Sequence, residues 1–357
     1  MKILTRYIWK TLGVTIALSM FLVFGLELIF SLVNELRYVG KGDYTIWHVL
    51  MFNLLSMPQN IYQMFPMAAL VGTLLGLGGL ASNSELVVMR SAGVSVKQII
   101  IMVLKLALIL STLAWTLGEW VAPVTDKWAQ NQKAFALSGG QTLKTEHGIW
   151  LRDGPHFINI RSADVGGHLE GIVSYEFNQH HEMVKSSEAS YADYINDLWV
   201  LKDVKVSVFE DDRVLQKHYD QLEWRSTIDP NILRIVGTKY LDELSLVGLW
   251  QTIKYRKLNN LEYKPYQLAL WQKIVQPLAI VMMMFLAIPF VFGPLRSSSK
   301  GFKLVVGIMV GFTFFIFDRL FGPLTLVYQI HPIIGACFPT ALFFALGLYA
   351  LRRWRAD

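Results

Sequence analysis

The stretch Ala81-Ser-Asn-Ser-Glu-Leu-Val-Val-Met-Arg-Ser-Ala-Gly-Val-Ser95 lies between two long apolar runs, at a point where the chain reverses direction. Its apolar residues recur at helical spacing, which predicts a short amphipathic helix over about residues 83–93 rather than a plain turn. Gly93 is expected to end that helix, because glycine readily adopts the positive φ angle that often follows a last helical turn. We therefore expect an α-helical membrane protein in which a short helix lies along one membrane surface between two spans.

The residues of this predicted helix leave two interpretations open. Ser82 or Ser84 can cap its N-terminus, and Glu85 lies in the first turn, where a negative charge suits the helix dipole. Leu86, Val87 and Met89 are expected to supply its apolar face, and Arg90 comes five residues after Glu85. One interpretation is an interfacial helix that only anchors the hairpin. The other is a docking element for a cytoplasmic partner.

Length and composition predict a membrane protein that carries a sizeable polar domain. The chain has 357 residues, of which 53% are hydrophobic and 17% charged, with a mean hydropathy of +0.38. The net charge of +6 does not indicate nucleic-acid binding, because the central segment Val124–Tyr266 holds 17 basic against 20 acidic residues. The single cysteine, Cys337, excludes an intrachain disulfide and a cysteine-based metal site.

Six apolar runs are long enough to cross a bilayer as helices, which takes roughly 20 residues each. They are about Leu12–Val33, Met64–Ala81, Ile99–Val121, Leu268–Phe292, Leu304–Phe321 and Ile333–Leu351. The first run lacks a convincing cleavage site, so we interpret it as a retained span and not as a signal peptide. Short connections on the side of the N-terminus hold eleven Lys and Arg residues against three on the other side. Both termini and the 83–93 helix are therefore predicted to face the cytoplasm.

The insert between the third and fourth spans, residues 124–266, reads as a β domain on the periplasmic side. Residues 150–153 and 157–160 flank an Asp-Gly pair, as in a hairpin, and residues 204–208 alternate as a half-buried strand does. Further short runs near Gly171–Phe177, Trp199–Leu201 and Leu233–Val236 suggest a sandwich or roll, and Leu241–Arg256 has helical spacing. The predicted domains are thus 1–123 with three spans, 124–266, and 267–357 with three spans.

Charged residues inside membrane spans are costly and are therefore candidate functional residues. Lys105, Glu119, Lys273 and Asp318 lie close enough to a span end to reach headgroup water. Glu27 in the first span is the candidate for proton coupling. Its structural alternative is an acid paired with another helix of this chain or of a partner.

Glycine and proline motifs in the spans have structural interpretations. Gly72-x3-Gly76 together with Gly78-Gly79 allows another helix to approach closely, more plausibly within this chain than across a partner interface. Phe292-Gly-Pro-Leu295 and Phe321-Gly-Pro-Leu324 are each expected to end a span at the membrane surface.

Sequence signatures of catalysis are absent from the chain. It contains no Gly-x4-Gly-Lys-Ser/Thr phosphate loop, no Gly-x-Ser-x-Gly elbow and no His-Glu-x-x-His helix. Its scattered histidines lack metal-ligand spacing, so no metal site is expected. We expect that the chain is not an enzyme, binds no cofactor and does not hydrolyse ATP itself.

Several motifs together resemble the lipopolysaccharide-export permeases of the Lpt system, the LptF/LptG family, and the G-type subunit more closely than its F-type paralogue. They are Leu4-Thr-Arg-Tyr7, Phe65-Pro-Met-Ala-Ala-Leu70, Ser84-Glu-Leu-Val-Val-Met-Arg-Ser-Ala-Gly93, Gly118-Glu-Trp-Val-Ala-Pro123, Phe292-Gly-Pro-Leu-Arg-Ser297 and Phe321-Gly-Pro-Leu-Thr-Leu-Val-Tyr328. The resemblance implies a polytopic bacterial inner-membrane protein with six transmembrane helices and an inserted periplasmic all-β, jellyroll-like domain.

The resemblance also implies a set of partners. An F-type permease subunit would pair with this chain, and two copies of a cytoplasmic ATPase of the LptB type, carrying ATP and Mg²⁺, would power the assembly. A C-type single-helix subunit (LptC) would insert beside the first span, and a periplasmic bridge protein (LptA) would receive lipopolysaccharide extracted from the outer leaflet.

Residue roles follow from the same resemblance. Glu85 matches the acid of the family's coupling helix, which makes Leu86, Met89 and Arg90 further ATPase-coupling candidates. The first and fifth spans would form lateral gates, with Glu27, Ser31 and Phe317 as gate or cavity candidates. Ser31 stands where comparable members carry a lysine thought to meet lipid phosphates, so the headgroup contact passes to Arg37 and Lys41.

Other classes of membrane protein remain as alternatives. A secondary transporter would use Glu27, Glu119 or Asp318 for protons and would transport without an ATPase. A mechanotransmitting subunit would pull on periplasmic proteins without moving lipid through its own spans. An enzyme housed in the insert is disfavoured, because the sequence shows no nucleophile–base or metal constellation.

Overall fold

The computed structural model describes most of the chain. The described residues are 2–137, 148–163, 168–178, 180, 182–195, 198–210, 213–224, 226, 228, 241, 244–292 and 299–356. Contacts divide the chain into two compact units, which we call the helical unit (Met1–Val39, Thr45–Gln130 and Gln267–Asp357) and the insert unit (Gly40–Tyr44 and Asn131–Tyr266). The predicted strand near Leu233–Val236 and most of the Phe292-Gly-Pro-Leu295 motif lie outside the described residues.

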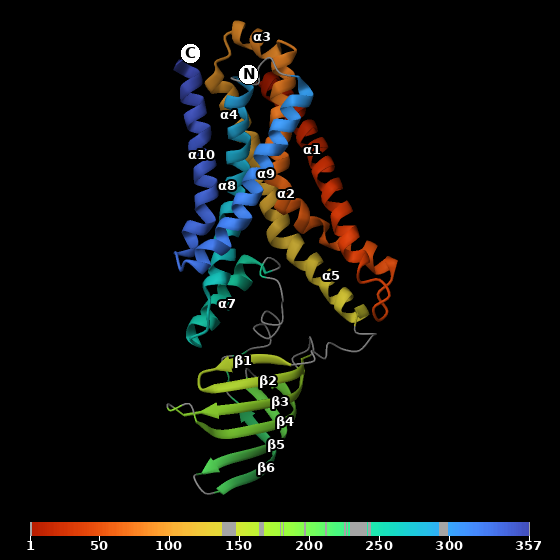
Figure 1. Ribbon diagram of the computed structural model, residues 1–357, viewed down its shortest axis with the longest axis vertical. Helices are drawn as coiled ribbons and strands as arrows, with labels where there is room; N and C mark the ends of the chain where they lie inside the picture. Colours follow the sequence, from red (N-terminus) through yellow and green to blue (C-terminus); the bar gives the residue numbers. More distant parts are fainter. Residues whose placement is uncertain are drawn as a thin grey trace. The chain divides into compact units, whose positions relative to one another are not determined.

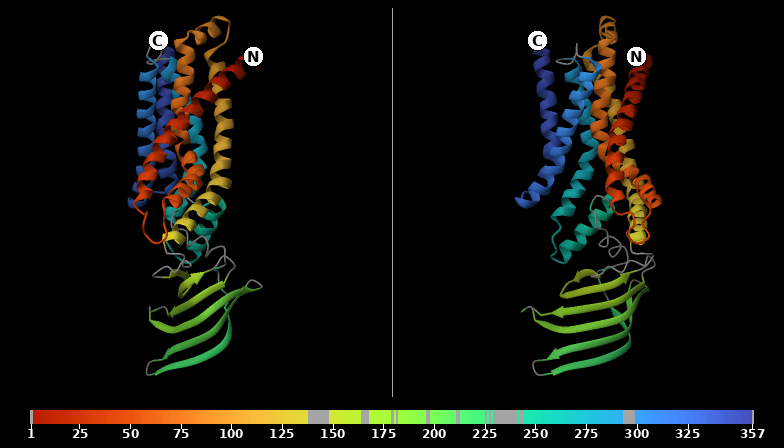
Figure 2. Two further views of the ribbon diagram at one scale, coloured as in Figure 1. Left: turned by 90° about the vertical axis from the view of Figure 1, so that its right-hand side faces the viewer. Right: turned by 45° about the vertical axis from the view of Figure 1, so that its right-hand side comes forward.

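The helical unit contains long apolar helices and one short connecting helix (Figure 1). The helices of the chain are α1 (Lys2–Leu36), α2 (Ile46–Ser82), α3 (Glu85–Ser91), α4 (Val96–Thr116), the π-helical turn η1 (Leu117–Val121), α5 (Ala122–Leu137), α7 (Leu246–Leu258), α8 (Lys264–Phe292), α9 (Lys300–Val327) and α10 (Pro332–Ala356). Six helical segments in the described part are long and apolar enough to cross a membrane, which confirms the predicted number of spans. Figures 1 and 2 show that α3 and both chain termini lie at the same end of the helical unit.

Polar residues interrupt the apolar sequence in the first half of α2, and for that reason the apolar-run criterion missed it. The helix begins at Ile46, well before the predicted span Met64–Ala81, because its polar side chains bond to neighbouring helices instead of to water. Asn60 donates to Glu27 of α1 at 2.9 Å, and the Ser56 hydroxyl donates to Asp126 of α5 at 2.6 Å. These bonds make a polar stretch compatible with the interior of a helical bundle.

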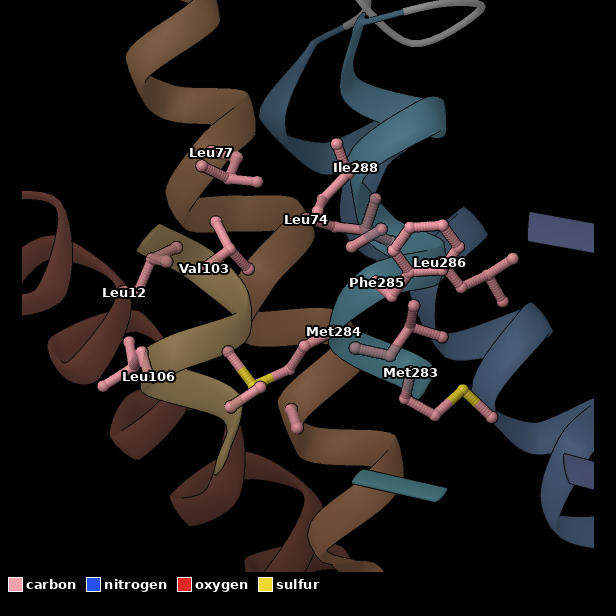
Figure 3. Close-up of a cluster of buried hydrophobic side chains, with 14 of the residues drawn as sticks. Leu12, Leu74, Leu77, Val103, Leu106, Met283, Met284, Phe285, Leu286 and Ile288 are labelled. Carbon is pink, nitrogen blue, oxygen red and sulfur yellow. The ribbon is translucent and has the colours of Figure 1, made fainter. Parts of the chain in front are cut away.

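The largest apolar core is built around α2. Figure 3 shows Leu12 of α1, Leu74 and Leu77 of α2, and Val103 of α4 directed toward one another, with Met283 and Met284 of α8 close by. All of these side chains are almost completely buried and belong to one cluster. Helices α1, α2, α4 and α8 therefore form one continuous packed body.

Glycines of α2 allow α1 to approach closely, as the Gly72-x3-Gly76 pattern predicts. A Cβ atom at Gly72 would overlap the backbone of Ile16, and one at Gly76 would lie 2.6 Å from the Thr15 hydroxyl oxygen. The Thr15 hydroxyl also donates to the Gly72 carbonyl at 2.8 Å. The small residues thus serve packing within the chain, and α1 is their partner.

The expectation that Gly322 and Pro323 end the fifth span was wrong. Helix α9 continues through Pro323 to Val327. A proline is tolerated there because bundle helices satisfy freed backbone groups with neighbouring side chains. Gly322 instead provides space for α8, since a Cβ atom would lie 2.8 Å from the Gln272 side chain.

The described strands of the insert unit form one antiparallel sheet in sequential order (Figure 2). The strands are β1 (Ile149–Asp153), β2 (His156–Ala163), β3 (His168–Phe177), β4 (Met183–Ile195), β5 (Leu198–Glu210) and β6 (Arg213–Trp224). The predicted hairpin is present, with Asp153 opposite His156 and Gly154 and Pro155 as its loop. The predicted alternation is confirmed in β5, where Val204 and Val206 are buried and Lys205 is exposed.

One face of the sheet carries an apolar cluster that includes Trp199 and Tyr255. The Trp199 indole donates to the Ile228 carbonyl at 2.7 Å. The Tyr255 hydroxyl, on α7, donates to the Arg152 carbonyl of β1 at 2.8 Å. The predicted helical return over Leu241–Arg256 is thus shorter at its start, and it packs on the sheet as part of this domain.

A charged cluster on the sheet gives the insert unit an acid-sensitive contact. The Asp193 carboxylate lies 2.7 Å from His168 Nδ1 and 3.1 Å from Lys202 Nζ. These two hydrogen bonds, the one from His168 being the larger cause, hold the pKa of Asp193 below its ordinary value of 3.8. A carboxyl whose pKa is lowered in the folded state stabilises the fold above its unfolded-state pKa, and this contribution disappears as the pH falls through the lower folded-state value.

We therefore expect Asp193→Asn to lower the apparent melting temperature of the insert unit near neutral pH. The difference in melting temperature from wild type should shrink as the pH falls below 3.8, because the wild-type carboxyl becomes protonated there and is then uncharged, as the asparagine is. Thermal unfolding of the full-length protein in detergent, followed over a pH series, measures this difference. Glu170→Gln, an exposed change on the neighbouring β3, is the matched control, and an undiminished difference at low pH would contradict the assignment.

Candidate functional site

The ends of α3 are defined by two residues with positive φ angles. Ser84 precedes the helix with φ 61°, and Gly93 follows it with φ 89°. The N–H of Val94 bonds to the Met89 carbonyl and that of Gly93 to the Arg90 carbonyl, the pattern of a Schellman motif. Gly93 therefore ends the helix as predicted.

The predicted serine cap is not formed at the start of α3. Ser84 occupies the cap position, but its left-handed backbone leaves its side chain without a capping hydrogen bond. The Ser82 hydroxyl donates to the Gly78 carbonyl in the last turn of α2. The left-handed Ser84 instead separates the two helices and turns the chain from α2 into α3.

The apolar residues of α3 divide between two faces. Leu86 is only 3% exposed and packs in the core of the helical unit, with Met89 against the same cluster. Val88 is 64% exposed, and Val87 and Arg90 are exposed beside it. Leu86 and Met89 thus pack α3 against the bundle. Val87 and Val88 form an outward apolar surface, and the sequence did not predict these two residues as docking residues.

Glu85 lies at the edge between these two faces and is held from outside its own helix. The Tyr7 hydroxyl of α1 donates to Glu85 Oε2 at 2.7 Å, and the Asn83 amide lies 3.3 Å from Oε1. Its side chain is half-buried, so it remains accessible from the end of the bundle. A fixed carboxylate beside an exposed apolar surface suits recognition by a partner that offers a basic group and a shallow apolar surface.

A second charged residue supports this segment from the opposite side. Lys303 of α9 is fully buried, and its Nζ donates to the Gly78 carbonyl at 2.9 Å and to the Ser82 hydroxyl at 2.8 Å. In the sequence, Lys303 is one of the eleven basic residues counted on the side of the N-terminus. Neither Tyr7 nor Lys303 could be recognised from the sequence, because their bonds join residues 78 and more than 200 positions apart.

The gate candidates of the first span are placed along α1. Glu27 Oε1 accepts the hydrogen bond from Asn60 of α2, which identifies an amide as its neighbour. Glu27 Oε2 is buried and has no hydrogen-bond partner within the described part of the chain. Ser31, one turn further, is half-buried.

The remaining candidates lie apart from this carboxylate. Arg37 and Lys41 are exposed in the turn that follows α1. Phe317 on α9 stacks on Phe321, with ring centroids 6.1 Å apart, and Phe321 stacks on Phe338 of α10. Phe317 therefore belongs to an aromatic row between α9 and α10.

Two charged residues expected to reach headgroup water are buried and paired instead. Lys273 Nζ of α8 lies 3.5 Å from Glu119 Oε2 of η1, and their side chains are only 8% and 9% exposed. Glu119 lies in the π-helical turn η1, where Gly118 packs closely on Tyr62, since a Cβ atom at Gly118 would lie 2.6 Å from the Tyr62 ring. Lys105 is exposed on α4 and Asp318 is half-buried on α9.

Metal-ligand groups do not converge in the portion of the chain that the structure describes, where no three His, Cys, Asp or Glu side chains are placed to hold an ion. The site that the structure does assemble is the α3 surface with its supports from α1 and α9.

Comparisons with known proteins cover nearly the whole chain. The family model described as "Lipopolysaccharide export system permease LptF/LptG" matches residues 6–353. The "Lipopolysaccharide export system permease protein LptG" of Escherichia coli (strain K12) is 40% identical over 354 residues, which are 98% of this chain and 98% of that protein. The protein of the same description from Haemophilus influenzae is 39% identical over 355 residues, 99% of each.

Proposed function

This chain belongs to the LptF/LptG family of lipopolysaccharide export system permeases, and we propose that it is the G-type subunit that couples lipid extraction to a separate ATPase through α3. It is a multi-pass membrane protein with a β domain inserted between its third and fourth spans. We place it in the bacterial inner membrane, with both termini and α3 in the cytoplasm and the β domain in the periplasm. The excess of Lys and Arg on the side of the termini supports that orientation.

The observation that carries the coupling role is the fixed position of Glu85. Its carboxylate is held between α1 and α3 and stands next to the exposed Val87 and Val88. An interfacial anchor would also present apolar side chains, because it buries them in lipid, but it has no use for an acid oriented by a neighbouring helix. The oriented acid is therefore the feature that favours docking. Arg90, exposed on the same helix, is placed to complement an acidic group of the partner.

The partners of the proposed complex follow from the family to which the chain belongs. The sequence has no phosphate-binding loop of its own, and we propose that the energy comes from a cytoplasmic ATPase, expected as two LptB-type copies carrying ATP and Mg²⁺. An F-type permease subunit would complete the membrane cavity. A C-type single-helix subunit (LptC) and a periplasmic bridge protein (LptA) would continue the route of the lipid.

We propose that nucleotide-driven closure of the ATPase displaces α3 and, with it, the helices packed on α2. Both α1 and α9 contact α2 through glycines, so movement of this group would change the width of a lipid cavity at its edges. Glu27, Ser31 and Phe317 are the proposed gate or cavity residues. Arg37 and Lys41 are exposed and basic beyond α1, which suits contact with lipid phosphates.

The test of this function is a pull-down of the full-length chain from membranes, with ATP hydrolysis measured on the recovered material. Glu85→Lys is expected to lose the ATPase by at least about tenfold, since it replaces a charge-assisted contact by like-charge repulsion, while an F-type permease still copurifies. Glu188→Lys, an exposed charge reversal on β4, should leave both partners bound. Recovery of the chain without any ATPase, in wild type as well, would overturn the proposal and favour secondary transport through Glu27.

A further inference from the structure

The last turn of α2 takes its positive charge from another helix. No basic residue lies in that turn of α2 itself. Lys303 supplies one from the beginning of α9, where its Nζ meets the Gly78 carbonyl and the Ser82 hydroxyl. A cation at a helix C-terminus is stabilised by the helix dipole and by the carbonyls that lack intrahelical partners. Lys303 thus binds α9 to the end of α2, immediately before α3.

Gly78 provides the space for this contact. A Cβ atom at position 78 would lie 2.7 Å from Lys303 Cδ, whereas one at the adjacent Gly79 would meet nothing within 4 Å. A fully buried ammonium is costly unless its hydrogen bonds are made, so its path into the bundle has to be well defined. Close packing against α1 explains Gly72 and Gly76, whereas Gly78 makes room for the lysine of α9.

On the opposite side, Tyr7 binds the same segment to α1. Its hydroxyl donates to Glu85 Oε2, and the next residue of α1, Ile8, is fully buried in the helical core. The chain between these two contacts contains the left-handed Ser84, which interrupts the helix between α2 and α3. Without hydrogen bonds from other helices to this segment, α3 could rotate about Ser84, and a displacement of α3 would not move α2.

We propose that Tyr7 and Lys303 are positioning residues that connect the segment Gly78–Glu85 to α1 and to α9, so that movement of α3 reaches both helices. This inference rests on the proposed docking function of α3. The two contacts bracket the break at Ser84, with Lys303 on its α2 side and Tyr7 on its α3 side. The two helices that these contacts reach, α1 and α9, are the first and fifth spans. Each of them also packs against α2 through glycines.

A merely structural role and a transmitting role predict different measurements. A structural anchor would change how much folded complex is recovered, and the activity of each recovered complex would stay the same. A transmitting contact would change the ratio between two activities of the same complex. That ratio is the amount of lipopolysaccharide released to an acceptor protein for each ATP hydrolysed.

The experiment uses the complete permease–ATPase complex in proteoliposomes containing lipopolysaccharide. Tyr7→Phe removes only the hydroxyl and is expected to lower lipid released per ATP about tenfold, as the loss of one hydrogen bond to a charged group would. Lys303→Met is expected to have an effect of at least this size, because it removes two donated bonds. Tyr349→Phe and Lys97→Met, both at exposed positions, are the matched controls and should keep the wild-type ratio.

Gly78→Ala provides a second route to the α9 contact if Lys303→Met yields too little folded complex. The added methyl group displaces the lysine side chain without removing its positive charge from the protein. The amount of lipid released per ATP should therefore fall again, whereas Gly79→Ala should not change it. An unchanged ratio for Tyr7→Phe together with Gly78→Ala would overturn the inference. That result is distinct from failure of the proposed function, in which Glu85→Lys would retain the ATPase.

Discussion

Lys273→Met is expected to lower the stability of the helical unit by about 3–5 kcal/mol, the usual cost of removing one partner from a buried ion pair. Lys273 and Glu119 face each other at 3.5 Å with almost no exposure. The substitution removes the positive charge beside the Glu119 carboxylate, and the carboxylate stays buried. A fall in the apparent melting temperature of the purified protein in detergent measures the loss.

Replacing both members of this pair separates the charge effect from packing. Lys273→Met combined with Glu119→Leu should recover most of the lost stability, because two apolar side chains no longer leave a charge without its counter-ion. Lys105→Met, which changes an exposed lysine of α4, is the control and should change little. A double variant as unstable as the single one would show that the pair holds η1 against α8 by shape rather than by charge.

Gly72→Ala is expected to separate α1 from α2 and to cost about 3 kcal/mol, the upper part of the range for overpacked interiors. The new Cβ atom would overlap the backbone of Ile16, which cannot rotate away as a side chain does. The Thr15–Gly72 hydrogen bond would be lost as well. Because α1 is a proposed gate helix, lipid export by the variant should fall together with its melting temperature.

The matched control for this prediction, Gly79, lies about two turns further along the same helix. Gly79→Ala adds the same methyl group in the same helix, but nothing lies within 4 Å of it. This variant should be as stable as wild type or slightly more stable, since alanine is the better helix former. Equal loss in both variants would mean that flexibility of α2, and not close packing, explains its glycines.

The number and order of the spans could be predicted from the sequence because an apolar run of membrane length is a local signal. The β character of the insert was visible for the same reason, in alternating residues such as those around Val204 and Val206. The first half of α2 was missed, since Ser56 and Asn60 are polar and only their partners on α5 and α1 make them suitable for burial. Polarity alone does not distinguish a loop from a helix whose polar groups are satisfied by its neighbours.

The helix of the candidate site was predicted from the sequence, whereas the surroundings of its residues were not. The docking role of Glu85 stays a prediction, and the sequence favoured Leu86 over the exposed Val88, because spacing alone does not say which side of a short helix faces the bundle. Tyr7 and Lys303 resembled ordinary residues at membrane flanks. Their roles depend on contacts between distant parts of the chain, which periodicity does not encode.

The connectivity of the sheet bears on the order in which a newly made chain folds. Every described strand pairs with its neighbour in sequence, so each hairpin can close as soon as it has been synthesised. The bonds of Lys303 to Gly78 and Ser82 span more than 220 residues and can form only after the fifth span has been inserted. A ribosome-bound intermediate would thus have a folded insert unit while the end of α2 still lacked its support from α9. If α3 docks an ATPase as proposed, that partner would meet a segment supported by α9 only on copies whose synthesis is complete.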